Sequence, residues 1–303
     1  MKRKASDPPK DLAIPVMLAP YGILFLVFIA IPVVIAILLS FSYFNTVRRP
    51  EFVGLNNYVA ILTQDEVFLK NVLPNTIKYS LFVGPVGYIL QFLLAWALAQ
   101  IPKRARTIYA LLFYSPSMTS GIAMAVIWKV IFSGDQFGYL NNVLMNMNLI
   151  EKPVQWLQNP DFLMNIMIIV TLWGSMGIGF LAILGGILNI DTEIYEAAYI
   201  DGVKNRFQEI IYVTIPCVKP QMMFGAVMSI VNTFSTGVIG VQLTGANPTP
   251  QNAGQLMINH IEDYGFLRYD MGYAAALSVL LLLMIYFCSK VVNRLFLEKE
   301  ERS

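Results

Sequence analysis

The sequence predicts an all-α membrane protein with six transmembrane helices. Of its 303 residues, 56% are hydrophobic and only 13% are charged, whereas soluble domains carry about 25% charged residues. The charges are concentrated in loops, and about 20 uncharged residues in a helix cross a hydrocarbon core of roughly 30 Å. Six uncharged windows are long enough: Leu12–Val47, Tyr79–Pro102, Thr107–Trp128, Phe162–Ile190, Gln221–Leu243 and Met271–Ser289.

Basic residues set the predicted orientation. Of the 21 lysines and arginines, 14 lie in alternate aqueous segments, and the side of the membrane richer in short basic loops is the cytoplasmic one. Both termini are therefore expected in the cytoplasm. The expected organisation is an N-terminal tail at 1–11, a first transmembrane helix with its outer segment at 12–74, a core of five helices at 75–290 that contains a cytoplasmic loop at 190–220, and a C-terminal tail at 291–303.

The segments between the windows are predicted to be loops with short helices. In the first outer segment, apolar spacing predicts an interfacial helix over Val59–Lys70. The second, Ser133–Asp161, is not a seventh span, because four asparagines between positions 141 and 148 would need partners inside lipid. The third is expected to contain a helix over Leu256–Tyr264. Lys129, at the outer end of the third window, is interpreted as an interfacial anchor.

Small and polar residues in the fourth and fifth windows have two interpretations. Gly174, Gly177 and Gly185 favour close helix packing. Polar side chains at membrane depth tend to face the bundle interior or a cavity, which makes four residues candidates for a substrate path. They are Trp173, Ser229, Asn232 and Thr233. Hydrogen bonds between helices explain the serine and threonine equally well.

The loop at 190–220 differs from the apolar windows around it. Asp191 is expected to cap a helix over Thr192–Asp201, with Tyr195, Ala198 and Tyr199 on one side. Gly202 follows where a helix end needs positive φ. A second helix is expected over Arg206–Val213, with Pro216 and Pro220 ending it and redirecting the chain.

The string Glu196-Ala-Ala-Tyr-Ile-Asp-Gly202 resembles the "EAA" coupling loop of binding-protein-dependent ABC importer permeases. The wider sequence resembles the maltose-type carbohydrate branch of that family, although the Ile215-Pro216 pair comes one residue later than in the family pattern, which places an extra residue within 203–206. The supporting segments are Phe52-Val-Gly-Leu-Asn-Asn-Tyr58, Asn75-Thr76, Ile127-Trp128 with Phe132, Gly138 with Asn141, and Gly272-Tyr-Ala-Ala275.

The resemblance implies a type I ABC importer permease fold in a bacterial or archaeal inner membrane. It also implies a second permease subunit, two ATPase subunits that bind ATP, an extracellular solute-binding protein, and a sugar or oligosaccharide as substrate. Five residues are then expected to dock the ATPase and transfer force: Glu196, Ala197, Ala198, Asp201 and Gly202. The chain has no G-x-x-x-x-G-K-[ST] loop of its own, so it is expected to be a transport subunit without a cofactor.

Other functions are less consistent with the sequence. An importer of the same architecture for a polyamine or an amino acid remains an alternative. A membrane-embedded enzyme would need acidic, basic or histidine side chains within the spans, and the six windows have none, while a channel gives the 190–220 loop no role. His260 is alone, and Cys217 and Cys288 are far apart, so no metal site is expected. Nucleic acid is not an expected partner, whereas membrane lipid is.

Overall fold

The computed structural model describes residues 13–119 and 121–297, and the predicted N-terminal tail at 1–11 lies outside them. The first window forms one rod, composed of α1 (Ala13–Phe25), a π-helical turn η1 (Leu26–Ala30) and α2 (Ile31–Leu39). It ends where Ser40, which is fully buried, turns the chain into β1 (Ser42–Tyr43). This strand pairs antiparallel with β2 (Glu51–Phe52).

The second span begins earlier than the sequence predicted. The expected single helix over Val59–Lys70 is wrong, because α3 (Asn56–Thr63) ends within that range and a new helix starts at Phe68. Asp65 causes the break: its carboxylate accepts the backbone N–H of Phe68 at 2.9 Å and so caps the new helix. That helix consists of η2 (Phe68–Val72) and α4 (Leu73–Ala99) and runs without interruption across the predicted 74/75 boundary.

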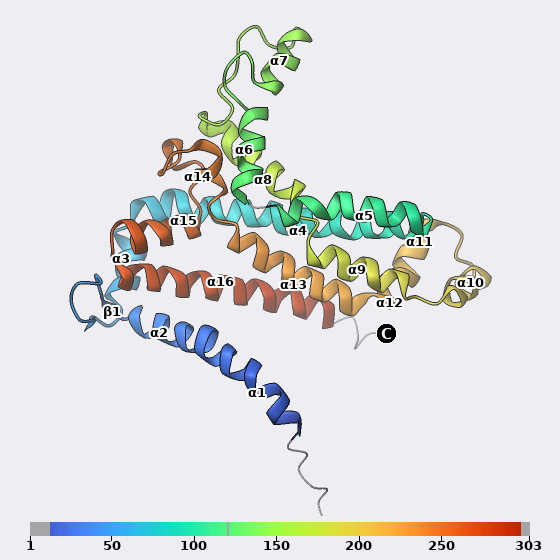
Figure 1. Ribbon diagram of the computed structural model, residues 1–303, viewed down its shortest axis with the longest axis horizontal. Coiled ribbons are helices and arrows are strands. Elements are labelled where there is room, and N and C mark those ends of the chain that lie inside the picture. Colours follow the sequence, from blue (N-terminus) through green and yellow to red (C-terminus); the bar gives the residue numbers. More distant parts are fainter. Residues whose placement is uncertain (1–12, 120, 298–303) are drawn as a thin grey trace, which may run out of the picture.

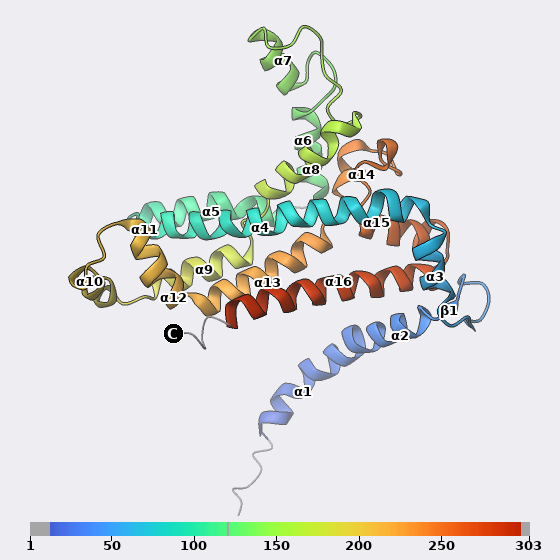
Figure 2. The same cartoon turned by 180° about the vertical axis from the view of Figure 1, so that it is seen from behind.

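The third and fourth windows each form two helices. The third contains α5 (Lys103–Met118) and α6 (Gly121–Ile131), which run in different directions in Figures 1 and 2. The fourth contains α8 (Pro160–Trp173) and α9 (Ile178–Leu188), bent by 41° at the break. Between these two windows, the second outer segment contains the short helix α7 (Tyr139–Asn146). This agrees with the prediction of loops and short helices there.

The fifth window is not one helix. Its first part is α13 (Lys219–Ser235), and α14 (Ile239–Thr244) comes after a break. At the break, Gly237 passes so close to Ile258 that a Cβ on Gly237 would lie 1.9 Å from the Ile258 Cβ. The expected continuous helix over Gln221–Leu243 is therefore wrong, because close packing against the next segment outweighs its apolar composition.

The C-terminal part agrees more closely with the prediction. After η4 (Pro250–Asn252), the third outer segment contains α15 (Met257–Glu262) and η5 (Asp263–Leu267), where a helix over Leu256–Tyr264 was expected. The last span is α16 (Met271–Leu297), which continues beyond residue 290. By length and composition, the described residues contain three helices able to cross a membrane, or up to six if each bent pair is one span.

The helices α4, α9 and α13 form the centre of the bundle. Gly179 of α9 and Gly225 of α13 allow the closest approach, since a Cβ on Gly179 would lie 3.1 Å from the Gly225 Cα. The expected contacts at Gly174, Gly177 and Gly185 are absent, because the first two lie in the α8–α9 break and a Cβ on the third meets nothing within 4 Å. The small residues that permit packing are therefore not the ones predicted.

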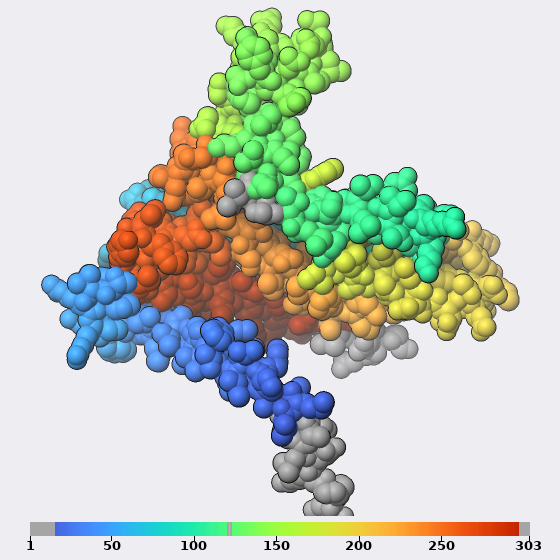
Figure 3. All heavy atoms as spheres, viewed as in Figure 1, coloured from blue at the N-terminus to red at the C-terminus, as the bar shows by residue number. Residues whose placement is uncertain are grey.

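The first rod stands apart from this centre. In Figure 3 its surface is visible along its whole length, and Figures 1 and 2 both show it diverging from α16. None of its most apolar 18-residue stretch is buried. Near its end, Tyr58 donates to the Ser40 hydroxyl at 2.7 Å, and Asn57 donates to the Ser40 carbonyl at 2.9 Å. The rod is therefore joined to the bundle near its β1 end.

Candidate functional site

The most prominent feature of the 190–220 loop is α10 (Thr192–Ile200), which lies at the end of the molecule opposite β1 (Figure 1). Asp191 has extended backbone but its side chain makes no capping hydrogen bond, so the expected cap is wrong. The C-terminal end of α10 agrees with the prediction of a positive φ at Gly202. Gly202 has φ +101°, and the N–H groups of Gly202 and Val203 donate to the carbonyls of Tyr199 and Ala198, which is a Schellman ending.

The five predicted coupling residues lie on this helix and at its end, and they differ in exposure. Glu196, Ala197, Asp201 and Gly202 are exposed, and Ala198 is half-buried. Beside them, Ile200 is 86% exposed. Glu196, Ala197 and Ile200 thus give α10 an exposed surface that combines a negative, a small and a large apolar side chain, and we call it the projecting surface.

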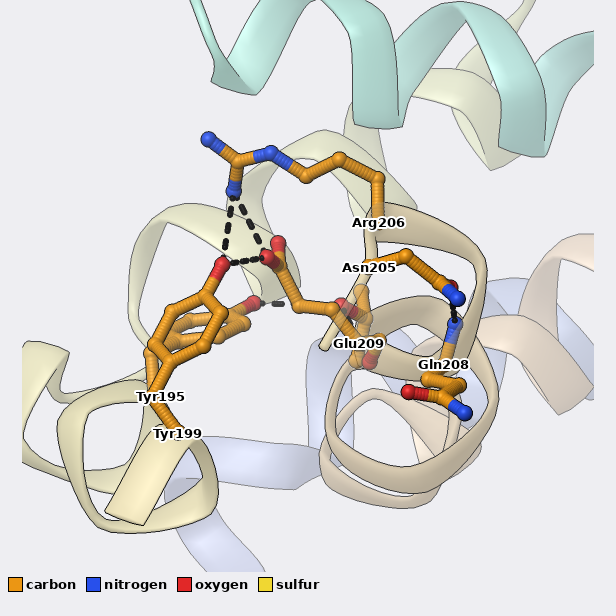
Figure 4. Close-up of polar contacts among 7 residues, drawn as sticks. Tyr195, Tyr199, Asn205, Arg206, Gln208 and Glu209 are labelled. Carbon is orange, nitrogen blue, oxygen red and sulfur yellow. Dashed lines mark hydrogen bonds and ion pairs between the residues drawn. The ribbon is translucent and has the colours of Figure 1, made fainter. Parts of the chain in front are cut away.

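A buried carboxylate holds the other side of α10 (Figure 4). Glu209 is 2% exposed, and it accepts hydrogen bonds from the Tyr199 hydroxyl and, at 2.6 Å, from the Arg206 guanidinium. The hydrogen bond to Glu209 raises the pKa of the Tyr199 phenol, and the same carboxylate raises the pKa of Arg206. Tyr199 therefore keeps its proton and Arg206 its charge at neutral pH.

A second contact lies one helical turn away. The hydroxyls of Tyr195 and Thr214 are 3.2 Å apart. Glu209 and Thr214 both belong to the helix that comes after α10, which is built from α11 (Arg206–Glu209), η3 (Ile210–Thr214) and α12 (Ile215–Cys217). We call this helix, over 206–217, the return helix. Asn205 caps its start by accepting the Gln208 N–H at 2.9 Å.

The return helix is longer than expected. It does not end at Val213, and Pro216 lies inside it, directly after the widened turn η3. Such a turn relaxes the hydrogen-bond ladder where proline lacks an N–H. The chain turns instead at Val218, by 84°, and Pro220 lies in the first turn of α13. The expected role of Pro216 as a stop is therefore wrong, whereas Pro220 does mark the redirected chain.

A cavity of about 400 Å³ lies beside the other end of α13. Its walls come from α4, α5, the α8–α9 break and α13. Its lining residues include ten polar side chains and no charged one among the residues that the structure describes. The polar ones are Gln91, Tyr114, Ser117, Thr171, Ser175, Ser229, Asn232, Thr233, Ser235 and Thr236.

The candidate path residues divide into two groups. Ser229, Asn232 and Thr233 line the cavity, whereas Trp173 does not and instead packs edge-on against Trp128. Ser229 donates to the Gly84 carbonyl of α4 at 3.3 Å, and Thr233 donates to the Ser229 carbonyl. These hydroxyls thus serve helix packing as well as the cavity. Asn232 is exposed and lines the cavity.

Four further residues of the site were not identified from the sequence. Arg206 and Glu209 at spacing i,i+3 resemble an ordinary surface pair, and nothing in the pattern indicates that Glu209 is buried. Gln91 and Tyr114 lie in windows interpreted only as spans. A glutamine in the middle of an uncharged window was a signal for Gln91, because a buried amide needs a partner.

Comparison with known proteins identifies relatives over nearly the whole chain. "Probable ABC transporter permease protein YesP" of Bacillus subtilis is 30% identical, over 94% of this chain and 90% of the relative. The "Arabinooligosaccharides transport system permease protein AraP" of the same organism is 29% identical, over 91% and 86%. The "Lactose transport system permease protein LacF" of Rhizobium radiobacter is 29% identical, over 88% of each.

A solved structure has the same fold. A crystal structure of a bacterial ABC transporter involved in the import of the acidic polysaccharide alginate contains a chain that is 26% identical, with a TM-score of 0.75 over 94% of this chain and 96% of that one. The model of the family described as "Binding-protein-dependent transport system inner membrane component" matches residues 91–299, which include α10, the return helix and most of the cavity. The chain therefore belongs to the binding-protein-dependent transport system inner membrane components.

Proposed function

We propose that this chain is the permease subunit through which an ATP-driven importer moves a neutral sugar or oligosaccharide across a bacterial or archaeal inner membrane. The uncharged, polar lining of the cavity carries the proposal of substrate class. Hydroxyl and amide groups exchange hydrogen bonds with sugar hydroxyls, and the Tyr114 ring offers an apolar face. A polyamine would need carboxylates, and a zwitterionic amino acid would need charged partners.

The printed names of the relatives support the same class. AraP and LacF are named for arabinooligosaccharides and for lactose. The cavity volume of about 400 Å³ lies within the usual range of small-molecule sites, roughly 300–1,000 Å³. We propose that Asn232 contacts the solute, while Ser229 and Thr233 shape the wall behind it.

The proposed energy source is a pair of ATPase subunits docked at the α10 surface. Glu196 is exposed there and offers a carboxylate to a partner arginine, a pairing that bidentate geometry favours. Ala197 and Ala198 permit close approach. The complete importer would contain this chain, a second permease subunit, two ATPases and an extracellular solute-binding protein. In this arrangement α10 and both termini face the cytoplasm, as the basic residues predict.

Uptake by the reconstituted importer tests this function. We expect proteoliposomes that contain the whole complex, its binding protein and internal ATP to accumulate labelled neutral oligosaccharide, because the cavity matches it in polarity. Labelled putrescine and amino acids serve as competing solutes. Uptake of putrescine or an amino acid without any sugar uptake would contradict the substrate class, and sugar uptake at full rate without ATP would contradict the importer itself.

A variant of the cavity tests its role. Asn232→Ala is expected to raise the apparent KM for sugar up to about tenfold, the equivalent of one lost hydrogen bond at about 1.4 kcal/mol. Asn146→Ala in the outer segment is the matched control, since it also removes an asparagine side chain but lies outside the cavity. Equal KM values for the two variants would exclude a contact between Asn232 and the solute.

A further inference from the structure

We infer that Tyr195 and Tyr199 are positioning residues that join α10 to the return helix, so that the two helices move as one body and carry displacement to the wall of the cavity. The inference rests on the proposed function, since it assigns a transmission path to the same loop. It concerns the side of α10 opposite to the projecting surface, and both tyrosines lie outside the five-residue coupling set.

The helix α10 has few other contacts that could hold it in place. None of its residues is buried, so it lacks the apolar contacts that normally fix a helix against its neighbours. Its two tyrosines are spaced i,i+4 and therefore lie on one face. Each reaches a different point of the return helix: Tyr199 bonds Glu209 at its beginning, and Tyr195 meets Thr214 one turn later. Two separated points of attachment prevent rotation as well as displacement.

The burial of Glu209 makes the first of these attachments strong. A carboxylate that is 2% exposed needs compensating partners. Arg206 and Tyr199 supply them, with the Arg206 side chain 63% exposed and Tyr199 46% exposed. The Glu209 carboxylate is therefore a fixed point of the return helix, and the Tyr199 side chain reaches it from α10 and donates a hydrogen bond to it (Figure 4).

The return helix leads directly into the wall of the cavity. Val218, at the 84° turn, is fully buried in a core cluster with Phe180 and Met222. Beyond it, α13 carries Ser229 and Asn232 into the cavity wall. A displacement of the return helix would therefore move the buried Val218 cluster, and with it α13, which lines the cavity. Rigid, closely packed elements transmit displacement in this way in other proteins.

The number of solute molecules transported per ATP hydrolysed tests the inference. The variants are Tyr195→Phe, Tyr199→Phe and the double variant, each in the complete importer with its binding protein, reconstituted in proteoliposomes. Phenylalanine keeps the ring and removes only the hydroxyl, and Arg206 still compensates the Glu209 carboxylate, so we expect folding and ATPase docking to be preserved. Tyr212→Phe is the matched control, because Tyr212 lies on the return helix and is 68% exposed.

We expect the double variant to lower transport per ATP at least about fivefold, with each single variant less affected and Tyr212→Phe equal to wild type. Glu209→Gln, which keeps an oxygen that can accept from Tyr199, is expected to fall between wild type and the double variant. An unchanged ratio in the double variant, measured per assembled complex, overturns the inference. Wild-type complex that shows no ATP-driven uptake would instead refute the proposed function, so the two failures are distinguishable.

Discussion

At the scale of single residues, Gly202 occupies a backbone conformation that only glycine adopts without strain. Its φ of +101° lies in the region that side chains rarely adopt, yet a Cβ added there would meet no atom within 4 Å. Any cost of substitution is therefore a backbone cost, of about 1–2 kcal/mol. Relaxing that strain would reorient Asp201 and Gly202 relative to the rest of α10.

Gly202→Ala is therefore expected to reduce ATP-driven uptake to about a tenth or less, the equivalent of about 1.4 kcal/mol, with unchanged abundance in the membrane. Uptake and immunodetection in the same membranes measure both. Gly185→Ala in α9 is the matched control, because a Cβ there also meets nothing within 4 Å and its φ is not positive. Wild-type uptake by Gly202→Ala would argue against a fixed geometry at this helix end.

Residues differ in how far the sequence reveals them. Gly202 was predictable because a glycine after a helical segment has one common use. Glu209 was not, because its burial depends on how α10 folds back over the return helix, a tertiary arrangement that i,i+3 spacing does not encode. Asp191 shows the opposite failure: its position favours a cap, but the side chain makes no such bond in the folded chain.

At the scale of elements, the break between α8 and α9 determines the shape of the cavity. Gln91 of α4 is 3% exposed and donates to the Ser175 carbonyl within that break at 2.6 Å. Its amide oxygen lies against α9, since a Cβ on Gly179 would meet it at 2.7 Å. One side chain thus ties α4 to the bent α8–α9 pair beside the proposed solute position.

We expect Gln91→Leu, which conserves volume and removes this bond, to raise the apparent KM for uptake up to about tenfold, since the lost hydrogen bond is worth roughly 0.5–1.5 kcal/mol. Initial uptake rates over a range of solute concentrations measure the effect. Gln100→Leu, at the exposed end of the same helix, is the control. Unaltered KM with wild-type abundance would show that the break holds without Gln91.

The elements themselves were mostly predictable, because long uncharged windows have few alternatives to transmembrane helices. Their interruptions were not. The fifth window breaks at Gly237 because the chain packs against Ile258, and the early start at Phe68 depends on the Asp65 cap. Both depend on neighbours that composition does not specify.

At the scale of the whole molecule, a buried polar cluster joins the beginning of the second span to the last third of the chain. Asp65, whose side chain is 7% exposed, accepts from His260 at 2.7 Å and from Tyr273 at 2.9 Å, as well as capping Phe68. Burial raises the pKa of Asp65, but these hydrogen bonds outweigh it, and the net pKa lies well below the ordinary value.

A carboxyl whose pKa is lowered in the folded state stabilises that state at pH values above its ordinary pKa, near 4. This stabilisation is lost as the pH falls below that value. Asp65→Asn is therefore expected to lower the thermal stability of the detergent-solubilised protein at pH 7. The difference from wild type should narrow progressively below about pH 4. Thermal unfolding measured across the acid and neutral range checks this. Glu66→Gln, one residue along and exposed, is the control, and a difference that widens in acid would contradict the sign.

The separation of the α1–α2 rod from the bundle has a consequence for biogenesis. This helix is made before every other helix that the structure describes, so none of those is available to it at that stage, and none of its most apolar 18-residue stretch is buried in the folded chain. The later helices cannot assist its entry into the bilayer, which favours insertion through its own apolar composition. Because its tie to the remainder lies near Ser40, synthesis of α3 is the earliest point at which the inserted helix gains a neighbour.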